Sequence, residues 1–182
     1  MRTKIRMTLS PTSVKQAQNE LLKYKKELLK KCQLFVDALA REGITVASAM
    51  SGGYGQYILF ERETEPTETG AKAIMYATNT GIIHSQWQLA DGTVREADVS
   101  PLLMAEFGAG LKANNSDVAK KYGMGTGTFP GQTHASDPEG WWYMDLSGVW
   151  HHSYGIDPPM PMEHASIAMC FLIADIAKEV WG

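Results

Sequence analysis

The architecture of this chain follows from its residues 10–50, SPTSVKQAQNELLKYKKELLKKCQLFVDALAREGITVASAM. Ser10 and Pro11 are typical of a helix start, because a serine hydroxyl caps free backbone N–H groups and proline lacks the N–H that would stay unbonded there. Apolar residues then recur at intervals of three or four: Leu21, Tyr24, Leu28, Cys32, Phe35 and Leu39. That spacing places them on one stripe of a long helix, and such a stripe predicts packing against a sheet. Gly43 can kink or end the helix, although the residues after it can also continue it.

Extended segments follow this helix in pairs. The glycine-rich turn at 51–55 precedes two predicted strands, at 56–63 and 71–78. A phosphate-binding glycine loop would need the reverse order, with a strand before the loop and a helix after it. Residues 82–99 predict a β-hairpin around Asp91-Gly92, a pair favoured in type I′ turns because both central residues need positive φ. We therefore expect antiparallel pairing of the strands.

The second half of the chain predicts a short helix, a long loop, a hairpin and a closing helix. Residues 100–110 repeat the Ser-Pro start and close the helix at Gly108. The segment 112–140 has no periodicity and is predicted to be a long irregular loop. Residues 141–152 predict a second hairpin. Residues 162–181 predict a helix that is apolar on much of its circumference and therefore expected to be buried.

Together these segments predict the α+β class, because helices and strands are segregated and no βαβ unit repeats. We expect one domain over residues 1–182, with an antiparallel sheet packed against the long N-terminal helix and the C-terminal helix. The apolar runs are too short for a membrane span or a signal peptide, so we expect synthesis in the cytoplasm and no membrane partner. Cys32 and Cys170 lie in predicted helices and are interpreted as small buried hydrophobic residues.

Charge is distributed unevenly along the chain. Residues 1–31 have a net charge of +7 and the remainder a net charge of −10, which gives the overall −3. This division fits a solvated helix face, a stripe that binds nucleic acid, or a basic end that docks onto the acidic body of another copy or a neighbour. The docking hypothesis makes Lys23, Lys26 and Lys30 candidate interaction residues. The glutamates at 61–68 are interpreted as a charged strand edge and turn.

Four of the five histidines fall within residues 134–165, HASDPEGWWYMDLSGVWHHSYGIDPPMPMEHA. A metal-dependent hydrolase would need three or four ligands that converge on one point. The candidate ligands are His134, His151, His164 and Asp145. However, His151 and His152 are neighbours on a predicted strand, so their side chains point to opposite faces and cannot easily share one metal ion.

Packing is the alternative explanation for this segment. Trp141, Tyr143 and Trp150 give the predicted hairpin large flat rings that can close a sheet against helices, with the histidines as half-buried polar caps. The sequence contains no GxSxG motif, and neither cysteine has an activating motif around it. We therefore predict that the chain is not an enzyme and needs no cofactor.

Four segments carry a resemblance to a known family: SPLLMAEFGAG (100–110), GTFPGQTHA (127–135), GWWYMDLSGVWHHSYGI (140–156) and PPMPMEHA (158–165). Together they resemble the head-tail joining proteins of long-tailed bacteriophages, also described as neck, tail-completion or minor tail component proteins. That family has a long N-terminal helix, a strand pair, a Glu-Phe-Gly element near mid-chain, and a proline followed by an apolar residue at the start of a C-terminal helix. The likeness covers nearly the whole chain.

The resemblance implies a virion structural protein that acts through contacts and not through catalysis. It implies a homo-oligomeric ring at the phage neck, beside the connector and tail proteins, with DNA passing through the ring without sequence-specific binding. Such a protein is made in the cytoplasm of the bacterial host and ends in the virion. The candidate interaction residues are Lys23, Lys26, Lys30, Glu106, Phe107 and Phe129.

Overall fold

The computed structural model describes residues 10–89, 91–126 and 135–182, and it confirms the α+β class. The helices are α1 (Pro11–Met50), η1 (Gly52–Tyr57, a 3₁₀ helix), α2 (Pro101–Phe107), η2 (Gly110–Lys112, a 3₁₀ helix), α3 (Asp117–Lys121) and α4 (Pro161–Trp181). The strands are β1 (Ile58–Pro66), β2 (Ala71–Asn79), β3 (Ile83–Gln88), β4 (Val94–Val99), β5 (Trp141–Met144) and β6 (Trp150–Ser153). Strand pairing among the described residues is antiparallel, as expected.

The long helix α1 begins as the sequence predicts and runs for 40 residues. The Ser13 backbone N–H donates to the Ser10 Oγ at 3.3 Å, and Pro11 occupies the first helical position. The helix passes through Gly43 and ends at Met50. The sequence left open whether Gly43 ends the helix, and the structure shows that the helix continues beyond it.

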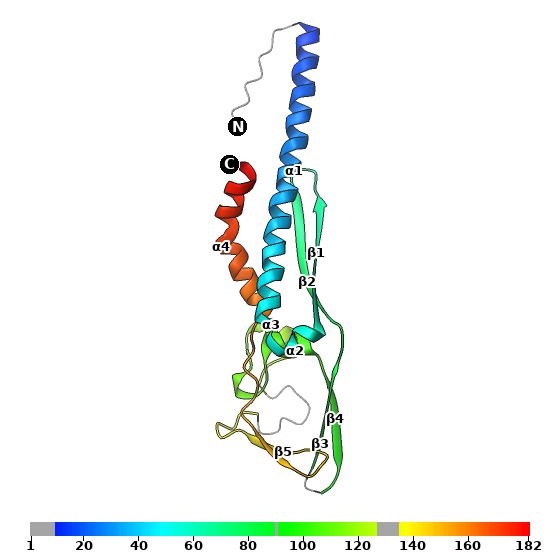
Figure 1. Cartoon of the computed structure of the whole chain (residues 1–182), viewed down its shortest axis with the longest axis vertical. Coiled ribbons are helices and arrows are strands. Elements are labelled where there is room, and N and C mark those ends of the chain that lie inside the picture. The colour runs from blue at the N-terminus through cyan, green and yellow to red at the C-terminus, as the bar shows by residue number, and fades with distance from the viewer. Residues whose placement is uncertain (1–9, 90, 127–134) are drawn as a thin grey trace.

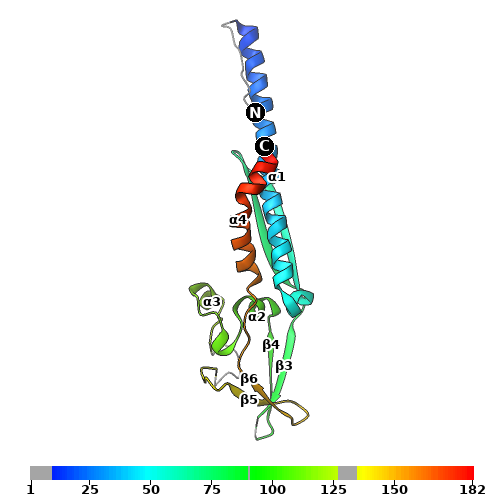
Figure 2. The ribbon, with the colours of Figure 1, turned by 60° about the vertical axis from the view of Figure 1, so that its left-hand side comes forward.

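The upper part of the molecule has three layers, with α1 between α4 and the β1–β2 hairpin (Figures 1 and 2). α4 runs antiparallel to α1, and the Trp181 ring near its end lies 4.9 Å from the Phe35 ring, measured between centroids. Farther along α1, a Cβ on Gly43 would come within 2.8 Å of the Met169 sulfur and 3.0 Å of the Met75 sulfur. The glycine therefore lets α4 and β2 approach α1 closely at the same level.

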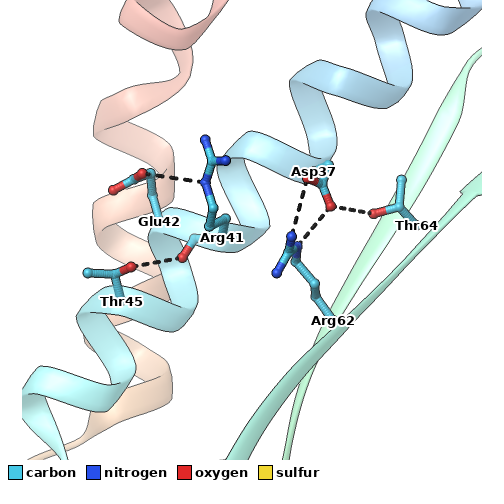
Figure 3. A network of polar contacts seen from close by, with 6 residues as sticks. All are labelled: Asp37, Arg41, Glu42, Thr45, Arg62 and Thr64. Atoms are coloured by element: carbon cyan, nitrogen blue, oxygen red, sulfur yellow. Dashed lines mark hydrogen bonds and ion pairs between the residues drawn. The ribbon is translucent and has the colours of Figure 1, made fainter.

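A polar cluster fixes the β1–β2 hairpin to α1 (Figure 3). The Asp37 carboxylate of α1 accepts hydrogen bonds from the Arg62 Nε at 2.8 Å, the Arg62 Nη2 at 3.4 Å and the Thr64 hydroxyl at 3.3 Å. The hydrogen bond from Arg62 is the main reason that the pKa of Asp37 lies below its ordinary value of 3.8. Because Arg62 and Thr64 are two positions apart on β1, they mark the face of the hairpin that is turned toward α1.

We expect the substitution Asp37→Asn to lower the free energy of unfolding by about 1 kcal/mol at neutral pH, since the ion pair is partly exposed and solvent screens it. The carboxylate's contribution is present above its unfolded-state pKa and is lost as the pH falls through the lowered pKa of the folded chain. Urea unfolding measured across acid pH should therefore show the wild-type and variant stabilities converging. A difference that stays constant into strong acid would contradict this role. Asp175→Asn, which removes an exposed ion pair with Lys178, is the control.

The second sheet lies at the end of the molecule opposite the N-terminal part of α1 (Figure 1). Its strand order is β4-β3-β5-β6, and its two hairpins meet at a single register pair, Gln88 and Met144. Both hairpins were predicted from the sequence. In the first, the Gly92 N–H donates to the Leu89 carbonyl at 2.9 Å, so Gly92, with φ of +85°, is the fourth residue of a turn that begins at Leu89. It is not a central residue of the turn, so the predicted type I′ turn around Asp91-Gly92 is wrong.

A small core lies where the two parts of the molecule meet. It consists of Val99, Met104, Phe107, Ala109, Ala119 and Met124. The segment 112–140 was predicted to be irregular, but it contains α3, whose Ala119 is fully buried in this core. Burial of this small residue, with the cap that the Ser116 hydroxyl provides, explains why a short helix forms there.

The prediction that α4 is buried is wrong. Only Pro161, Ala165 and Ile176 of this helix are buried, and 80% of Phe171 is exposed. Cys170, also predicted to be buried, is exposed as well. One side of α4 packs on α1, and no described residue covers the other side to a similar extent. None of the described helices is long and apolar enough to cross a membrane.

Candidate interaction surfaces

The first half of α1 extends beyond α4, the β1–β2 hairpin and the other described elements (Figures 1 and 2). α4 and the tip of the β1–β2 hairpin both end near the middle of α1, where Trp181 reaches Phe35. Residues 11–30, here called the projecting half of α1, span about 30 Å at 1.5 Å per residue. Most side chains of this half are exposed, and Ala17 is buried.

An apolar stripe runs along α1 and is covered on only part of its length. Its second part, which includes Phe35, packs against the helix α4, so the prediction that the stripe packs against a sheet is wrong there. In the projecting half the same stripe remains exposed: 55% of Leu21, 46% of Tyr24 and 40% of Leu28. Since each side chain is already about half covered, full cover by a neighbour would add about 1 kcal/mol per residue. Contiguous apolar surface of this kind marks an interaction site.

A basic side lies roughly opposite the apolar stripe on the projecting half. Lys23, Lys26 and Lys30 follow one another at three and four residues, which places them on one helix side. All three are exposed, and none forms an ion pair or hydrogen bond with a residue that the structure describes. The exposed Leu22 flanks this side. The three predicted interaction residues are thus brought together on one accessible surface.

The sequence interpretation missed a second accessible surface, on the side of the β1–β2 hairpin that faces away from α1. Side chains alternate between the two faces of a strand, so the residues whose side chains point away from those of Arg62 and Thr64 form this second surface. It is here called the outer hairpin face. Its members are Leu59, Glu61, Glu63 and Glu65 of β1 and Lys72, Ile74, Tyr76 and Thr78 of β2. The alternation of glutamate with other residues in β1 was the signal that could have identified it.

The outer hairpin face combines acidic and apolar groups. Of the three carboxylates on this face, that of Glu65 accepts a hydrogen bond from the Lys72 Nζ at 2.8 Å, and this bond lowers the pKa of Glu65. Glu63 accepts a bond from the Tyr76 hydroxyl at 3.3 Å. Leu59 and Ile74 are exposed on the same face. The face therefore carries three carboxylates against one ammonium group, interspersed with apolar side chains.

Glu106 and Phe107, which the resemblance makes candidate interaction residues, have contacts inside the chain. Phe107 is buried in the core, with the Tyr122 ring stacked on it at a centroid distance of 5.9 Å. The half-buried Glu106 carboxylate accepts hydrogen bonds from the backbone N–H groups of Met162 at 2.9 Å and Glu163 at 3.0 Å. Burial raises the pKa of Glu106 above its ordinary value, and the two N–H bonds act in the opposite direction. Both residues therefore stabilise the fold of the chain through contacts within it.

The aromatic hairpin β5–β6 is not packed as the sequence predicted. Of the three rings that were expected to pack, Tyr143 and Trp150 are exposed, because the hairpin joins the remainder of its sheet through the single pair Gln88 and Met144. Only Trp141 is half-buried, with its ring against Gly110. The neighbouring Trp142 is exposed and contacts the His152 ring, with centroids 4.6 Å apart. The expectation that the rings close a sheet against helices is therefore wrong for Tyr143 and Trp150.

The histidines of this hairpin point apart, as predicted. His151 Nε2 lies 2.9 Å from the Asp145 Oδ2, and this contact lowers the pKa of Asp145. His152 instead meets the rings of Trp142 and Tyr154. Among the residues that the structure describes, no three side chains of His, Cys, Asp or Glu approach closely enough to hold a metal ion.

Two residues named in the sequence analysis lie outside the described residues: Phe129, a candidate interaction residue, and His134, a candidate metal ligand. The hydrolase alternative, which needs His134, therefore stays a prediction.

Comparisons of the chain with protein-family models, with curated proteins and with solved structures give no match.

Proposed function

We propose that this chain is a virion structural protein of the neck of a long-tailed bacteriophage, where it helps to join head and tail. In this proposal copies of the chain form a ring that contacts the neighbouring connector and tail proteins, and DNA passes through the ring without being read. The chain is made in the host cytoplasm, resides in the virion and has no catalytic role.

The observation that carries the proposal is the partly covered apolar stripe of α1. α4 covers the stripe around Phe35 and leaves it open at Leu21, Tyr24 and Leu28. The exposed stripe gains little stability from the described part of the chain, since most helical stability in proteins comes from packing of the apolar face. This observation supports a subunit whose packing is completed by neighbours, as in an assembled ring.

The total surface of the chain supports the same proposal. The accessible area is 12274 Å², whereas a compact monomer of this mass is expected to expose about 8,700 Å². The excess includes large apolar side chains on α1, on α4 and on the β5–β6 hairpin, such as Leu21, Phe171 and Trp142. A surface this extended and apolar is typical of an assembly component and not of an isolated globular enzyme.

An early stop codon in the gene tests the proposal directly. Electron microscopy of a lysate from the phage or induced prophage that carries this variant should show filled heads lying apart from tails, or tails of abnormal length. Supplying the intact chain from a plasmid should restore joined, infectious particles, which controls for effects on neighbouring genes. Normal infectious particles without the chain would overturn the neck function.

A further inference from the structure

We propose that the basic side of the projecting half of α1 docks onto the outer hairpin face of a second copy of this chain. The inference deepens the proposed ring, on which it rests, by naming the two surfaces that meet between adjacent subunits. One subunit contributes Lys23, Lys26 and Lys30, and its neighbour contributes Glu61, Glu63 and Glu65.

Charge and hydrophobicity are complementary between the two surfaces. The helix side offers three ammonium groups without an ion-pair partner among the described residues, flanked by the exposed Leu22. The hairpin face offers three carboxylates, of which only Glu65 has an ion pair there, beside the exposed Leu59 and Ile74. Opposite charges fix partner choice and register, while the apolar side chains supply burial.

The lengths of the two surfaces also agree. The projecting half of α1 covers 20 residues, or about 30 Å. β1 has nine residues, which span about 30 Å in an extended strand. A helix laid along the hairpin would therefore meet the face over its whole length.

A contact already present within one chain shows why the projecting half of a second copy would dock on the outer hairpin face. It would not dock on the inner hairpin face, which is the face turned toward α1. Within one chain, the inner hairpin face presents Arg62 to Asp37 of α1, so the base is on the strand and the acid on the helix. On the outer hairpin face the acid is on the strand, and in the projecting half the base is on the helix. The reversed polarity directs the projecting half away from inner faces and toward outer ones.

Charge also disfavours pairing of two projecting halves with each other. Residues 10–31 contain six lysines and two glutamates, so two such segments side by side would repel. Docking of the helix of one copy on the hairpin of the next joins two different surfaces. A heterologous contact of this kind can propagate from subunit to subunit and closes into a ring when the rotation permits.

Disulfide trapping tests the contact in the full chain. In a background with Cys32→Ala and Cys170→Ser, one sample carries Lys26→Cys and another carries Glu63→Cys. These are the central members of the two rows, so they approach each other whichever way the helix lies along the hairpin. After mixing and mild oxidation, a covalent dimer should form in the mixture and hardly at all in either sample alone. Raising the salt concentration should lower its yield, because the attraction is between exposed charges.

The control replaces Glu63→Cys with Glu96→Cys, an exposed glutamate on β4 at the other end of the molecule. Cross-linking should be about tenfold weaker in this mixture than in the Lys26 and Glu63 mixture. Equal yields with the two partners, or no dimer with either, would overturn the proposed contact.

Charge reversal of the outer members provides an independent readout. Adding Lys23→Glu and Lys30→Glu to the Lys26→Cys chain should reduce dimer yield about tenfold, since the two charge pairs that remain between the rows, with Glu61 and Glu65, become like-charge contacts. Adding Glu61→Lys and Glu65→Lys to the partner chain should restore the yield. A reduction that the second reversal does not restore would contradict direct pairing of the two rows.

The two proposals fail in different ways. If the stop codon separates heads from tails but the central pair does not cross-link, the neck function stands and this docking is wrong. If the central pair cross-links but particles without the chain are normal, the contact is real and the neck function is wrong.

Discussion

Replacing Gly108 by alanine should destabilise the chain by about 3 kcal/mol or more. Gly108 has φ +67° and ψ −161°, a backbone conformation found almost only in glycine. A Cβ at this position would lie 2.3 Å from the Ile156 carbonyl oxygen and 2.8 Å from the Pro158 Cδ. That carbonyl accepts a hydrogen bond from the Ala109 N–H at 3.0 Å, so the clash would also break the bridge that holds residues 109 and 156 together.

Two other glycines serve as controls for this prediction. Gly123 has φ +69°, but a Cβ there would meet nothing within 4 Å, so Gly123→Ala should cost only the backbone strain of about 1 kcal/mol. Gly53 combines open space with an ordinary φ, so Gly53→Ala should be close to neutral. Thermal unfolding should therefore rank the variants, with the Gly108→Ala midpoint lowest by about 10 °C. A Gly108→Ala midpoint equal to that of Gly123→Ala would contradict the steric argument.

The second large effect is expected for Glu106→Ala, at about 2 kcal/mol of lost unfolding free energy. The residue before α4, Met160, has φ +48° and provides no side-chain cap, so the first N–H groups of α4 have no local acceptor from that residue. Glu106 of α2 supplies both missing bonds, to Met162 and Glu163, from 56 and 57 positions away. Its carboxylate also lies at the positive end of the α4 dipole.

Glu163→Ala is the matched control for the Glu106 prediction. Glu163 is an exposed carboxylate in the same first turn of α4, so it shares the dipole interaction but accepts neither bond. Its removal should cost about 0.5 kcal/mol. Urea unfolding curves for the two variants would show whether the bonds or the charge alone stabilise the helix start. Equal losses would mean that Glu106 acts only through its charge.

These two predictions give a physical meaning to the Glu-Phe-Gly element of the family resemblance. Glu106 caps α4, Phe107 fills the core, and Gly108 allows the chain to pass close to Ile156. Glu106 and Gly108 link α2 to the segment that leads into the last helix, and Phe107 packs on Tyr122. The spacing of the three residues in the sequence reveals none of this, because the contacts of Glu106 and Gly108 join residues about 50 positions apart.

Local signals in the sequence were reliable where one short segment determines its own conformation. The Ser10-Pro11 start of α1 and the Ser100 cap of α2 are present as predicted, and Gly92 takes the positive φ expected of a glycine in the hairpin loop, although the turn is not of the predicted type. Capping and turn formation depend on a few neighbouring residues, and the sequence displays those residues directly.

Burial could not be predicted in the same way. The apolar character of Phe171 and Trp150 led to the expectation that α4 and the second hairpin are covered, yet both residues are more than half exposed. Apolar content states only that a surface favours burial, and it does not say whether the same chain or a neighbour provides the cover. The outer hairpin face was missed for a related reason, since the glutamates in β1 fit a solvated strand equally well until the fold shows which face meets α1.

The continuity of α1 has a mechanical consequence. Its 40 residues form one rod of about 60 Å, whose far end meets α4 and β2 at Gly43 and whose near end carries no tertiary partner within the described chain. Force applied by a neighbour at Lys23 or Leu21 would act on a lever whose fulcrum is the contact between Phe35 and Trp181. A small tilt at the tip would then move the layer around Gly43 in the opposite sense, and in the proposed ring this movement would couple the packing of one copy to the position of the next.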